Sequence, residues 1–547
     1  MRRRTSLNGI WKWVFDQYES VLRSHLGFVS ATAKKHVDTI FPPDWRMMRI
    51  PCSWNLAAPE LLHYDGALLF QRQFSYRRPP RNRRVFLCFE ASYYQTRVWL
   101  NGAEIGMHNG GFTPFEFDIT EHLRTRNTLH VWVDASRRAE WVPCCLTDWY
   151  NYGGIFRPVF LEERPRDAIR HFFVFYRGGK VHVRIETTGR RMGHAILEIP
   201  ELSVRQDLKV YNRRCRAAIT CQPILWSPAK PKCYRVRCLY GNDVIEEHIG
   251  FRTIEARAGR IWLNGQPLKL KGVCLHEEAA PRGRALTAAD RRLIFDTARA
   301  LGLNFLRLAH YPHAREMALE ADRRGILLWE EIPVYWYIQF TNPQTYHDAA
   351  NQLTELIRRD CNRASVAMWS VANETPEYYE NRTRFISDLA VLARKLDPSR
   401  PITAAIFKRN ENQKITVADP LAASLDILGV NQYGGWYAGT WDDLKHFANI
   451  HYPDKPVIIS EFGADAKKGL HGRGKFTEDY QRALYRHTLT AIRQNPYIQG
   501  VTPWILFDFR SPNRINIHQN GFNRKGLVDA DRKRRKLAFY EYQRWHF

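Results

Sequence analysis

The sequence contains no apolar run of about 18 residues, the length that a membrane-spanning helix needs. Its ten cysteines form neither a CxxC pair nor a Cys/His cluster at zinc spacing. We interpret the adjacent Cys144 and Cys145 as two reduced, partly buried thiols. These absences argue against a membrane protein and against a structural zinc site.

Acidic residues are few relative to basic ones: 56 Asp and Glu stand against 82 Lys and Arg, a formal net charge of +26. Such an excess is typical of proteins that bind nucleic acid or anionic surfaces. The basic residues are spread along the chain, however, and no groove-reading motif accompanies them. The densest run, RKRRK at 532–536, is predicted to be the solvated face of a terminal helix. We therefore predict no nucleic-acid partner and expect the charge to steer an anionic substrate.

The N-terminal run MRRR has the charge of a signal-peptide n-region, but the following residues 7–15 are interrupted by Asn8, Gly9 and Lys12. Without an apolar h-region, the chain is predicted to be unprocessed and cytoplasmic. No low-complexity linker or internal repeat separates its parts, so we expect its domains to pack as one unit. The oligomeric state is left open, a homo-oligomer included.

Two glutamates follow apolar runs that are typical of buried strands. The run VAMWSVA (366–372) leads into Asn373 and Glu374, and the run PVIIS (456–460) leads into Glu461. Either glutamate alone is as well explained as a residue that caps a helix N-terminus. As a pair at the carboxyl ends of buried strands, they are the minimum requirement of a retaining glycosidase.

The length of 547 residues suggests about three or four domains. Short strands separated by turn signals, such as Asn101-Gly102, predict a β-sandwich over residues 1–165. Alternation of apolar and polar residues predicts a second sandwich over 166–254. From 255 to 547, strands alternate with helices, as in a TIM barrel. The eight expected barrel strands span 268–274, 303–308, 326–331, 366–372, 402–405, 427–430, 457–460 and 500–504.

Several motifs resemble glycoside hydrolase family 2 over nearly the whole chain. WSVANE (369–374) resembles the family's acid/base signature and ISEFG (459–463) its nucleophile signature. The stretches VWLNG (98–102), GGFTPF (110–115) and TDWYNYGGIFR (147–157) resemble its N-terminal domain. The resemblance implies an N-terminal jelly-roll β-sandwich, an immunoglobulin-like β-sandwich and a C-terminal (β/α)8 barrel. It also implies that Glu374 and Glu461 follow strands four and seven, and that no metal or organic cofactor is needed.

The resemblance further implies roles for individual residues. Glu374 would be the acid/base and Glu461 the nucleophile, Asn373 would bind the sugar 2-hydroxyl, and Tyr433 would hydrogen-bond the nucleophile. Trp504 would shape the subsite, and Asp148 would reach into it from the first domain, although an Asx turn or a helix cap explains Asp148 equally well. His276 and Tyr437 also follow barrel strands and are candidates for binding the sugar. The expected substrate-binding set is Asp148, His276, Asn373, Tyr433, Tyr437, Trp504, Asn523 and Lys525.

The stretch NRKG (523–526) resembles the Asn-x-Lys-Gly motif with which β-glucuronidases of the family hold the sugar carboxylate. A fixed ammonium and an amide donor give a carboxylate charge-assisted hydrogen bonds, and a neutral sugar is expected to leave Lys525 uncompensated. We therefore predict a retaining exo-β-glucuronidase whose partner is a carbohydrate with a terminal β-uronic acid. The chain departs from that group at RSP (510–512) and in the stretch that follows through Gln519, and WEEIP (329–333) is closer to galactosidase-like members. A β-galacturonidase or β-galactosidase is the alternative within the family, and a non-catalytic polyanion-binding protein the alternative outside it.

Overall fold

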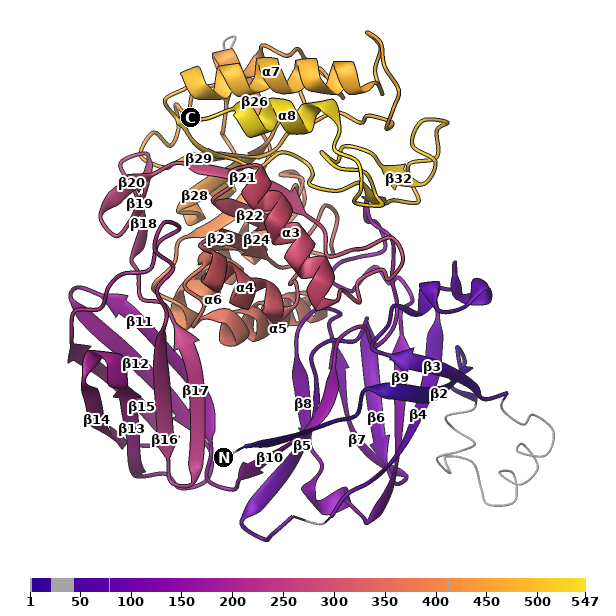
Figure 1. Ribbon diagram of the computed structural model, residues 1–547, viewed down its shortest axis with the longest axis vertical. Coiled ribbons are helices and arrows are strands. Elements are labelled where there is room, and N and C mark those ends of the chain that lie inside the picture. The colour runs from indigo at the N-terminus through magenta and orange to yellow at the C-terminus, as the bar shows by residue number, and fades with distance from the viewer. Residues whose placement is uncertain (1, 21–43, 78, 412–413) are drawn as a thin grey trace.

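The computed structural model describes residues 2–20, 44–77, 79–411 and 414–547. Two β-sandwiches precede a closed barrel of eight parallel strands, as Figure 1 shows. The predicted fold class is therefore confirmed. Met1, where the predicted first domain and the basic N-terminal run begin, lies outside the described residues. No described helix is both long and apolar enough to cross a membrane.

The first sandwich contains a six-stranded and a four-stranded antiparallel sheet. Its hairpin at Asn101-Gly102 joins β6 and β7, and both turn residues adopt the positive φ that this short turn requires. The first sheet has the order β3 (Arg46–Ile50), β2 (Gly9–Phe15), β4 (Ala67–Ser75), β9 (Arg126–Asp134), β6 (Gln95–Leu100) and β7 (Ala103–Asn109). The second has the order β1 (Arg3–Ser6), β10 (Val159–Pro165), β5 (Arg83–Phe89) and β8 (Phe115–Asp118).

The second sandwich packs a three-stranded sheet on a four-stranded sheet around its own apolar core. The smaller sheet has the order β11 (Ile169–Arg177), β12 (Lys180–Thr187) and β15 (Arg214–Thr220). The larger has the order β14 (Val204–Val210), β13 (Gly193–Ile199), β16 (Tyr234–Tyr240) and β17 (Asp243–Ile249). A small sheet of β18 (Ile254–Arg257), β19 (Arg260–Leu263) and β20 (Gln266–Leu268) then leads into the barrel.

The barrel contains all eight strands that the sequence predicts. They are β21 (Leu270–Leu275), β22 (Phe305–Leu308), β23 (Leu327–Glu331), β24 (Val366–Asn373), β25 (Ile402–Ile406), β28 (Ile427–Asn431), β29 (Val457–Glu461) and β30 (Ile498–Val501). The helices are α3 (Ala288–Ala300), α4 (Arg315–Arg324), α5 (Pro343–Asp360), α6 (Arg382–Leu396), α7 (Glu478–Gln494) and α8 (Leu537–Arg544). Two short antiparallel pairs lie in the loops: β26 (Arg409–Glu411) with β27 (Lys414–Thr416), and β31 (Phe509–Arg510) with β32 (Phe522–Asn523).

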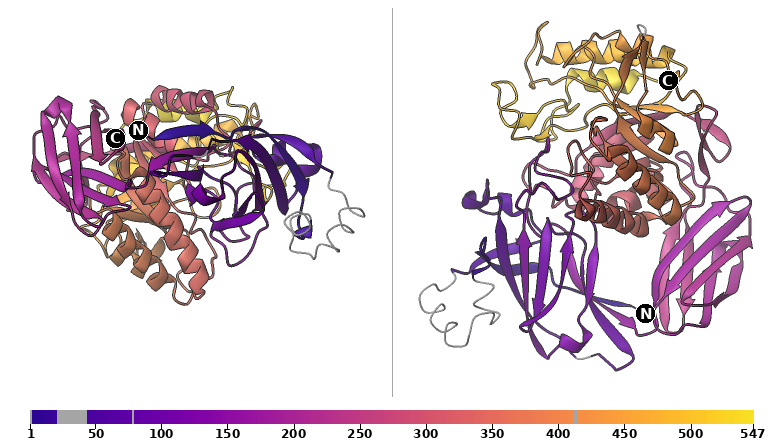
Figure 2. Two further views of the ribbon diagram at one scale, coloured as in Figure 1. Left: turned by 90° about the horizontal axis from the view of Figure 1, so that it is seen from below. Right: turned by 180° about the vertical axis from the view of Figure 1, so that it is seen from behind.

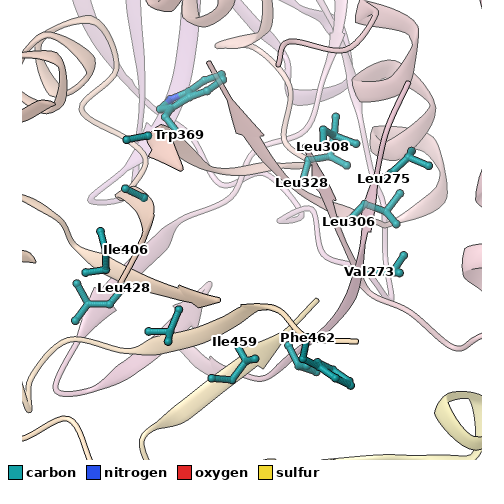
Figure 3. Close-up of a cluster of buried hydrophobic side chains, with 14 of the residues drawn as sticks. Val273, Leu275, Leu306, Leu308, Leu328, Trp369, Ile406, Leu428, Ile459 and Phe462 are labelled. Carbon is teal, nitrogen blue, oxygen red and sulfur yellow. The ribbon is translucent and has the colours of Figure 1, made fainter. Parts of the chain in front are cut away.

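Successive side chains of the barrel strands pack on different sides. Leu306 and Leu308 of β22 belong to the cluster that joins the strands to the surrounding helices; Figure 3 shows part of this cluster beside a helix. Phe305 belongs instead to a separate cluster with Leu327 and Ile458. By this alternation Arg307 shares the inward side with Phe305, and it is 0% exposed. An arginine inside a barrel must have anionic partners, because an unpaired buried charge is costly.

The two sandwiches contact different parts of the barrel, and Figure 2 shows them on opposite sides of the molecule. The loop at 147–157 of the first sandwich lies over the carboxyl ends of the strands, where Trp149 packs 4.7 Å from Tyr335 and 5.8 Å from His310 between ring centroids. The second sandwich contacts the far end, where Asn362 exchanges hydrogen bonds with the backbone of β11. The first sandwich alone is therefore placed to contribute side chains to the barrel mouth.

Two sequence-based expectations for the C-terminal part are wrong. The eighth strand ends at Val501, so Trp504 lies in the loop beyond it and does not close the strand. The basic run at 532–536 precedes α8 and does not form one of its faces. Lys536 is fully buried, and its Nζ donates to Asp508 Oδ1 at 2.7 Å. Lys533, Arg534 and Arg535 are exposed, as expected of a solvated run, whereas pairing with a buried carboxylate holds Lys536 inside.

Candidate active site

Glu374 and Glu461 both stand at the carboxyl ends of barrel strands, one directly after β24 and the other as the last residue of β29. Glu461 is 4% exposed; its Oε1 accepts from Arg307 Nη1 at 2.8 Å and its Oε2 from the Tyr433 hydroxyl at 2.7 Å. Glu374 is partly exposed and accepts from two neutral donors, Asn431 Nδ2 at 2.9 Å and Trp336 Nε1 at 2.8 Å. One carboxylate is therefore held by a cation and the other by uncharged groups.

Arg307 links the strand ends, a role that the sequence did not reveal. Its guanidinium contacts Glu461, donates to Asn373 Oδ1 at 2.7 Å, and lies 3.2 Å from Glu331 Oε1. Burial by itself would raise the pKa of Glu331. The neighbouring Arg307 and His310 outweigh this effect and lower the pKa to about 2. The available signal was a lone arginine within the apolar strand FLRL, which had to face either a partner or a site.

His310 is a buried, hydrogen-bonded residue in the loop after β22. Its Nδ1 is 2.7 Å from Glu331 Oε1, and its ring stacks on Trp504 with centroids 4.8 Å apart. Trp504 is 4% exposed and also meets His276 edge to face at 5.2 Å. These rings form the wall of the barrel mouth.

Burial and the neighbouring charges act in opposite directions on the pKa of Glu461. Burial raises the pKa of Glu461 to about 8; Arg307 opposes this rise, the nearby Glu374 charge adds to it, and the Tyr433 hydrogen bond opposes it. Arg307 is thus the group that most favours the negative charge on Glu461.

Two buried nitrogen atoms of the expected site have no hydrogen-bond partner among the described residues: Asn373 Nδ2 and His276 Nε2. The other polar atoms of both side chains are used, since Asn373 Oδ1 accepts from Arg307 and His276 Nδ1 lies 3.1 Å from the Tyr311 hydroxyl. Burial lowers the pKa of His276 well below its usual value, so its ring is neutral. Buried polar atoms are normally satisfied, which makes both of them suitable partners for substrate hydroxyls.

The second half of the site is a cluster of charged side chains from two domains. Asp148 belongs to the first sandwich and accepts from Arg514 Nε at 3.0 Å and from Asn523 Nδ2 at 3.3 Å, both of the barrel domain. Lys525 is buried and donates to Asp465 Oδ2 at 2.6 Å and to the Tyr437 hydroxyl at 2.8 Å. The structure thus brings Asp148, Tyr437, Asn523 and Lys525 together, as the sequence-based set requires.

One part of the sequence argument about Lys525 is wrong. A neutral sugar was expected to leave its ammonium uncompensated, but Asp465 already forms an ion pair with it. Although burial lowers the pKa of Lys525, the Asp465 charge raises it above the usual value. Asp465 lies four residues after Glu461, beyond the nucleophile motif. Its position in the sequence therefore does not predict a contact with Lys525.

Arg514 is the other residue of the cluster that sequence reasoning missed. It pairs with Asp148 and also donates from Nη1 to the Tyr437 hydroxyl at 3.0 Å. The Tyr437 oxygen therefore accepts hydrogen bonds from two cations, although the side chain is 55% exposed. Arg514 lies in the stretch after RSP (510–512), where the chain departs from its family pattern, so the motif gave no sign of it.

Gly526 fixes the loop that carries Asn523 and Lys525. A Cβ at this position would lie 2.3 Å from the Asp508 backbone nitrogen, so only glycine fits. The Gly526 N–H donates to Asp508 Oδ1 at 2.9 Å, and the buried Lys536 ammonium neutralises the same carboxylate. Lys536 thus supports the loop of the charged cluster, which is proposed to recognise the sugar and is called the recognition cluster.

The cluster is adjacent to the catalytic pair. The Tyr437 ring meets the Tyr433 ring edge to face with centroids 5.1 Å apart, and the Lys525 ammonium lies 5.8 Å from the Tyr433 ring. Because Tyr433 in turn donates to Glu461, only one side chain separates Lys525 from that carboxylate. A single sugar ring could contact both parts of the site.

Comparison with known proteins agrees with this arrangement. Residues 254–547, more than half of the chain, match the family "Glycosyl hydrolases family 2, TIM barrel domain", and residues 5–165 match the family 2 sugar binding domain. The β-glucuronidase of Paenibacillus borealis is 28% identical over 91% of this chain and 91% of its own length. The human β-glucuronidase is 27% identical over 91% of this chain and 84% of its own length.

Solved structures show the same architecture. A β-glucuronidase from an uncultured Clostridium species superposes with a TM-score of 0.85 at 27% identity, covering 100% of this chain and 98% of its own. The Faecalibacterium prausnitzii β-glucuronidase also gives a TM-score of 0.85 at 27% identity, covering 99% and 97%. With the family match over both flanking domains, the conclusion is that the chain belongs to glycosyl hydrolase family 2 and is a β-glucuronidase-like glycoside hydrolase.

Proposed function

We propose that the protein is a retaining exo-β-glucuronidase that cleaves terminal β-D-glucuronides by double displacement. The observation that carries the choice of sugar is the convergence of Lys525 and Arg514 on one oxygen, the Tyr437 hydroxyl. An oxygen held between an ammonium and a guanidinium marks a position that suits a carboxylate better than a hydroxyl. The named relatives, both β-glucuronidases at 27–28% identity, support the same choice.

In the first step Glu461 attacks the anomeric carbon while Glu374 gives its proton to the leaving oxygen, so that the aglycone departs as an alcohol. In the second step Glu374 takes a proton from water, which releases the sugar from Glu461 with its β configuration retained. The contacts favour this division of roles, because Arg307 stabilises negative charge on Glu461 whereas Trp336 and Asn431 leave Glu374 without a cation. The unpartnered Asn373 Nδ2 would donate to the 2-hydroxyl.

The Asp465–Lys525 ion pair favours a second candidate, a β-galactosidase. Because that pair is neutral by itself, a neutral sugar can bind without leaving a buried ammonium unpaired. A β-galacturonidase differs from the main proposal only at the 4-hydroxyl. The non-catalytic, polyanion-binding alternative is set aside, since the chain is a glycoside hydrolase.

A panel of nitrophenyl β-glycosides tests the proposal. The β-glucuronide should give the highest kcat/KM, above the galacturonide, galactoside and glucoside. Hydrolysis of the galactoside with no hydrolysis of either uronide would transfer the assignment to the second candidate. Release of the β-anomer of the sugar, followed by NMR during the first turnovers, separates retention from inversion.

A further inference from the structure

A hollow of about 580 Å³ opens beside Glu374, outside the part of the site described above. Aromatic and proline side chains dominate its lining: Tyr337, Pro376, Tyr378, Phe407 and Pro420. They come from the loops after β23, β24 and β25 and from a turn that follows β27. The hollow therefore lies at the carboxyl end of the barrel, on the side of Glu374.

The hollow adjoins Glu374 through chain neighbours and one hydrogen bond. Pro376 follows Glu374 by two positions, and Tyr337 follows Trp336, whose Nε1 donates to Glu374 Oε2 at 2.8 Å. Tyr335 stacks on Trp336 with centroids 4.5 Å apart, so an aromatic wall extends from the barrel mouth to the hollow. A group that accepts a proton from Glu374 has to lie on this side, and in a glycosidase that group is the aglycone oxygen.

The lining presents ring faces to solvent. Tyr378 is 78% exposed, Tyr337 41% and Phe407 40%. Tyr379 stacks on Tyr378 at 5.0 Å and meets Tyr337 edge to face at 5.6 Å, so the tyrosines support one another in a single patch. Exposed aromatic patches beside a site are characteristic of binding surfaces.

The charged residues that line the hollow favour an uncharged ligand. Its two charged lining residues, Glu377 and Arg409, form an ion pair with each other. A sugar in this place would need donors and acceptors for several hydroxyls, whereas five of the seven lining residues present rings. The lining therefore suits a flat, weakly polar group that stacks.

We propose that this hollow is the aglycone subsite and that it selects planar aromatic aglycones, so that aryl conjugates are the substrates. The inference rests on the proposed function in one respect: Glu374 must be the acid that protonates the leaving group. The inference goes beyond the proposed function by naming the class of molecule that is released. It does not depend on the identity of the sugar, because the hollow lies on the Glu374 side and Lys525 on the Tyr433 side.

The test compares substrates that share a sugar and differ in the aglycone. The sugar is the one that the nitrophenyl panel shows to be cleaved, and the aglycones are methyl, a second sugar, 4-nitrophenyl and a polycyclic phenol such as naphthol. Phe407→Ser, Tyr378→Ser and Tyr337→Ser each remove one ring. Tyr211→Ser, which removes a tyrosine 67% exposed on the second sandwich, is the matched control.

Each of the three variants should raise KM for the naphthyl substrate by about fivefold, the effect expected of one lost stacking contact, and change KM for the methyl substrate by less than about twofold. Free naphthol should inhibit the parent enzyme competitively and inhibit the triple variant at least about tenfold less well. The control should behave like the parent. Melting temperatures within a few degrees of the parent show that the variants are folded.

Equal losses on methyl and naphthyl substrates would overturn the proposal, as would no loss on either. A larger loss on the disaccharide than on the naphthyl substrate would make the hollow a sugar subsite instead. If no glucuronide is cleaved but another glycoside is, the proposed function fails and the aglycone series on that other sugar still decides this inference.

Discussion

Glu374 and Glu461 stand directly on strand ends of one barrel, whereas Lys525, Arg514 and Asp148 come from loops of two domains. Arg307 of β22 and Tyr433 hold Glu461, whereas Asn431 at the end of β28 and Trp336 hold Glu374. The second group is held by its own ion pairs, Asp148 with Arg514 and Asp465 with Lys525. We propose that the first part carries out the reaction and is fixed by the barrel, and that the second recognises the sugar and is fixed by ion pairs between loops, one of which joins two domains.

The difference indicates which part of the site can exchange residues: the strand ends or the loop cluster. A strand end cannot move without disturbing the barrel, so the catalytic residues are confined to a short, recognisable motif. A loop cluster can exchange members as long as the charges balance, and here Arg514 enters from a stretch that departs from the family pattern. Reaction type and sugar specificity are therefore separable, and the following predictions test that separation from the largest expected effect to the smallest.

The catalytic pair should respond asymmetrically. Glu461→Gln should abolish turnover of every substrate, because no covalent intermediate can form. Glu374→Gln should still form the intermediate from substrates with very good leaving groups, and azide should then rescue turnover as a β-glycosyl azide. Product analysis by NMR distinguishes the two. Rescue of the Glu461 variant as an α-azide would mean that the roles are reversed, and Glu380→Gln, an exposed glutamate of the same loop, serves as the control.

The pH profile should separate reaction from recognition. Burial raises the pKa of Glu461, the proposed nucleophile, to about 8. Only the ionised carboxylate can attack, so kcat/KM should fall about tenfold for each pH unit below that value. The pKa of Lys525 is raised, so its positive charge persists on both sides of this pH and does not contribute to the loss. A kcat/KM that stays constant between about pH 6 and 8 would contradict this assignment.

Removal of Lys525 should change specificity more than it changes the reaction. Lys525→Ala should lose about tenfold or more in kcat/KM on a β-glucuronide, since a charge-assisted hydrogen bond contributes about 1.5–3 kcal/mol. Hydrolysis of an uncharged β-glucoside or β-galactoside should fall much less, and Asn523→Ala should show the same selectivity more weakly. The two kcat/KM values are measured side by side.

A control is needed because Lys525→Ala leaves Asp465 buried and unpaired. The double variant Lys525→Met with Asp465→Asn removes both charges and should restore the melting temperature but not the glucuronide activity. Equal losses on charged and neutral sugars in both variants would mean that Lys525 supports only the fold.

Asp148 tests the contribution of the first sandwich. Asp148→Asn weakens its pairing with Arg514 and should lower glucuronide kcat/KM by about fivefold, the size of one ordinary hydrogen bond, with less effect on a neutral glycoside. Asp118→Asn, which removes an exposed carboxylate paired with Arg84 in the same sandwich, is the control and should have no effect. Equal effects of the two substitutions would place Asp148 outside the recognition cluster.

The net charge of +26 should have the smallest effect. If it steers an anionic substrate, kcat/KM for a glucuronide should fall by about threefold as salt rises to 0.15 M, because exposed charges are screened over about 10 Å at 0.1 M. A neutral glycoside gives the reference. A flat profile for both would show that the charge does not act on the substrate, and tight DNA binding at physiological salt would assign it to a different partner.

The sequence by itself determined the barrel, both sandwiches and the two strand-end glutamates. Alternation, strand length and turn residues are local properties, so β24 and β29 were predicted to within two residues and Asn101-Gly102 was identified as a hairpin turn. Each family motif likewise covers one strand and its adjoining loop, so it can be recognised within a short stretch of sequence. The buried contacts of Glu374 and Glu461 then follow from the closure of the barrel.

Only the tertiary structure decided how charges are paired. Asp465 with Lys525, Asp148 with Arg514 and Asp508 with Lys536 join residues 60, 366 and 28 positions apart, and no local pattern encodes these pairs. In the run 532–536 the residues Lys533, Arg534 and Arg535 are exposed and Lys536 is buried, and the composition of the run does not reveal which residue meets a carboxylate. Burial of an ion is stabilised by partners that the fold supplies, and for this reason the recognition cluster had to be read from the structure.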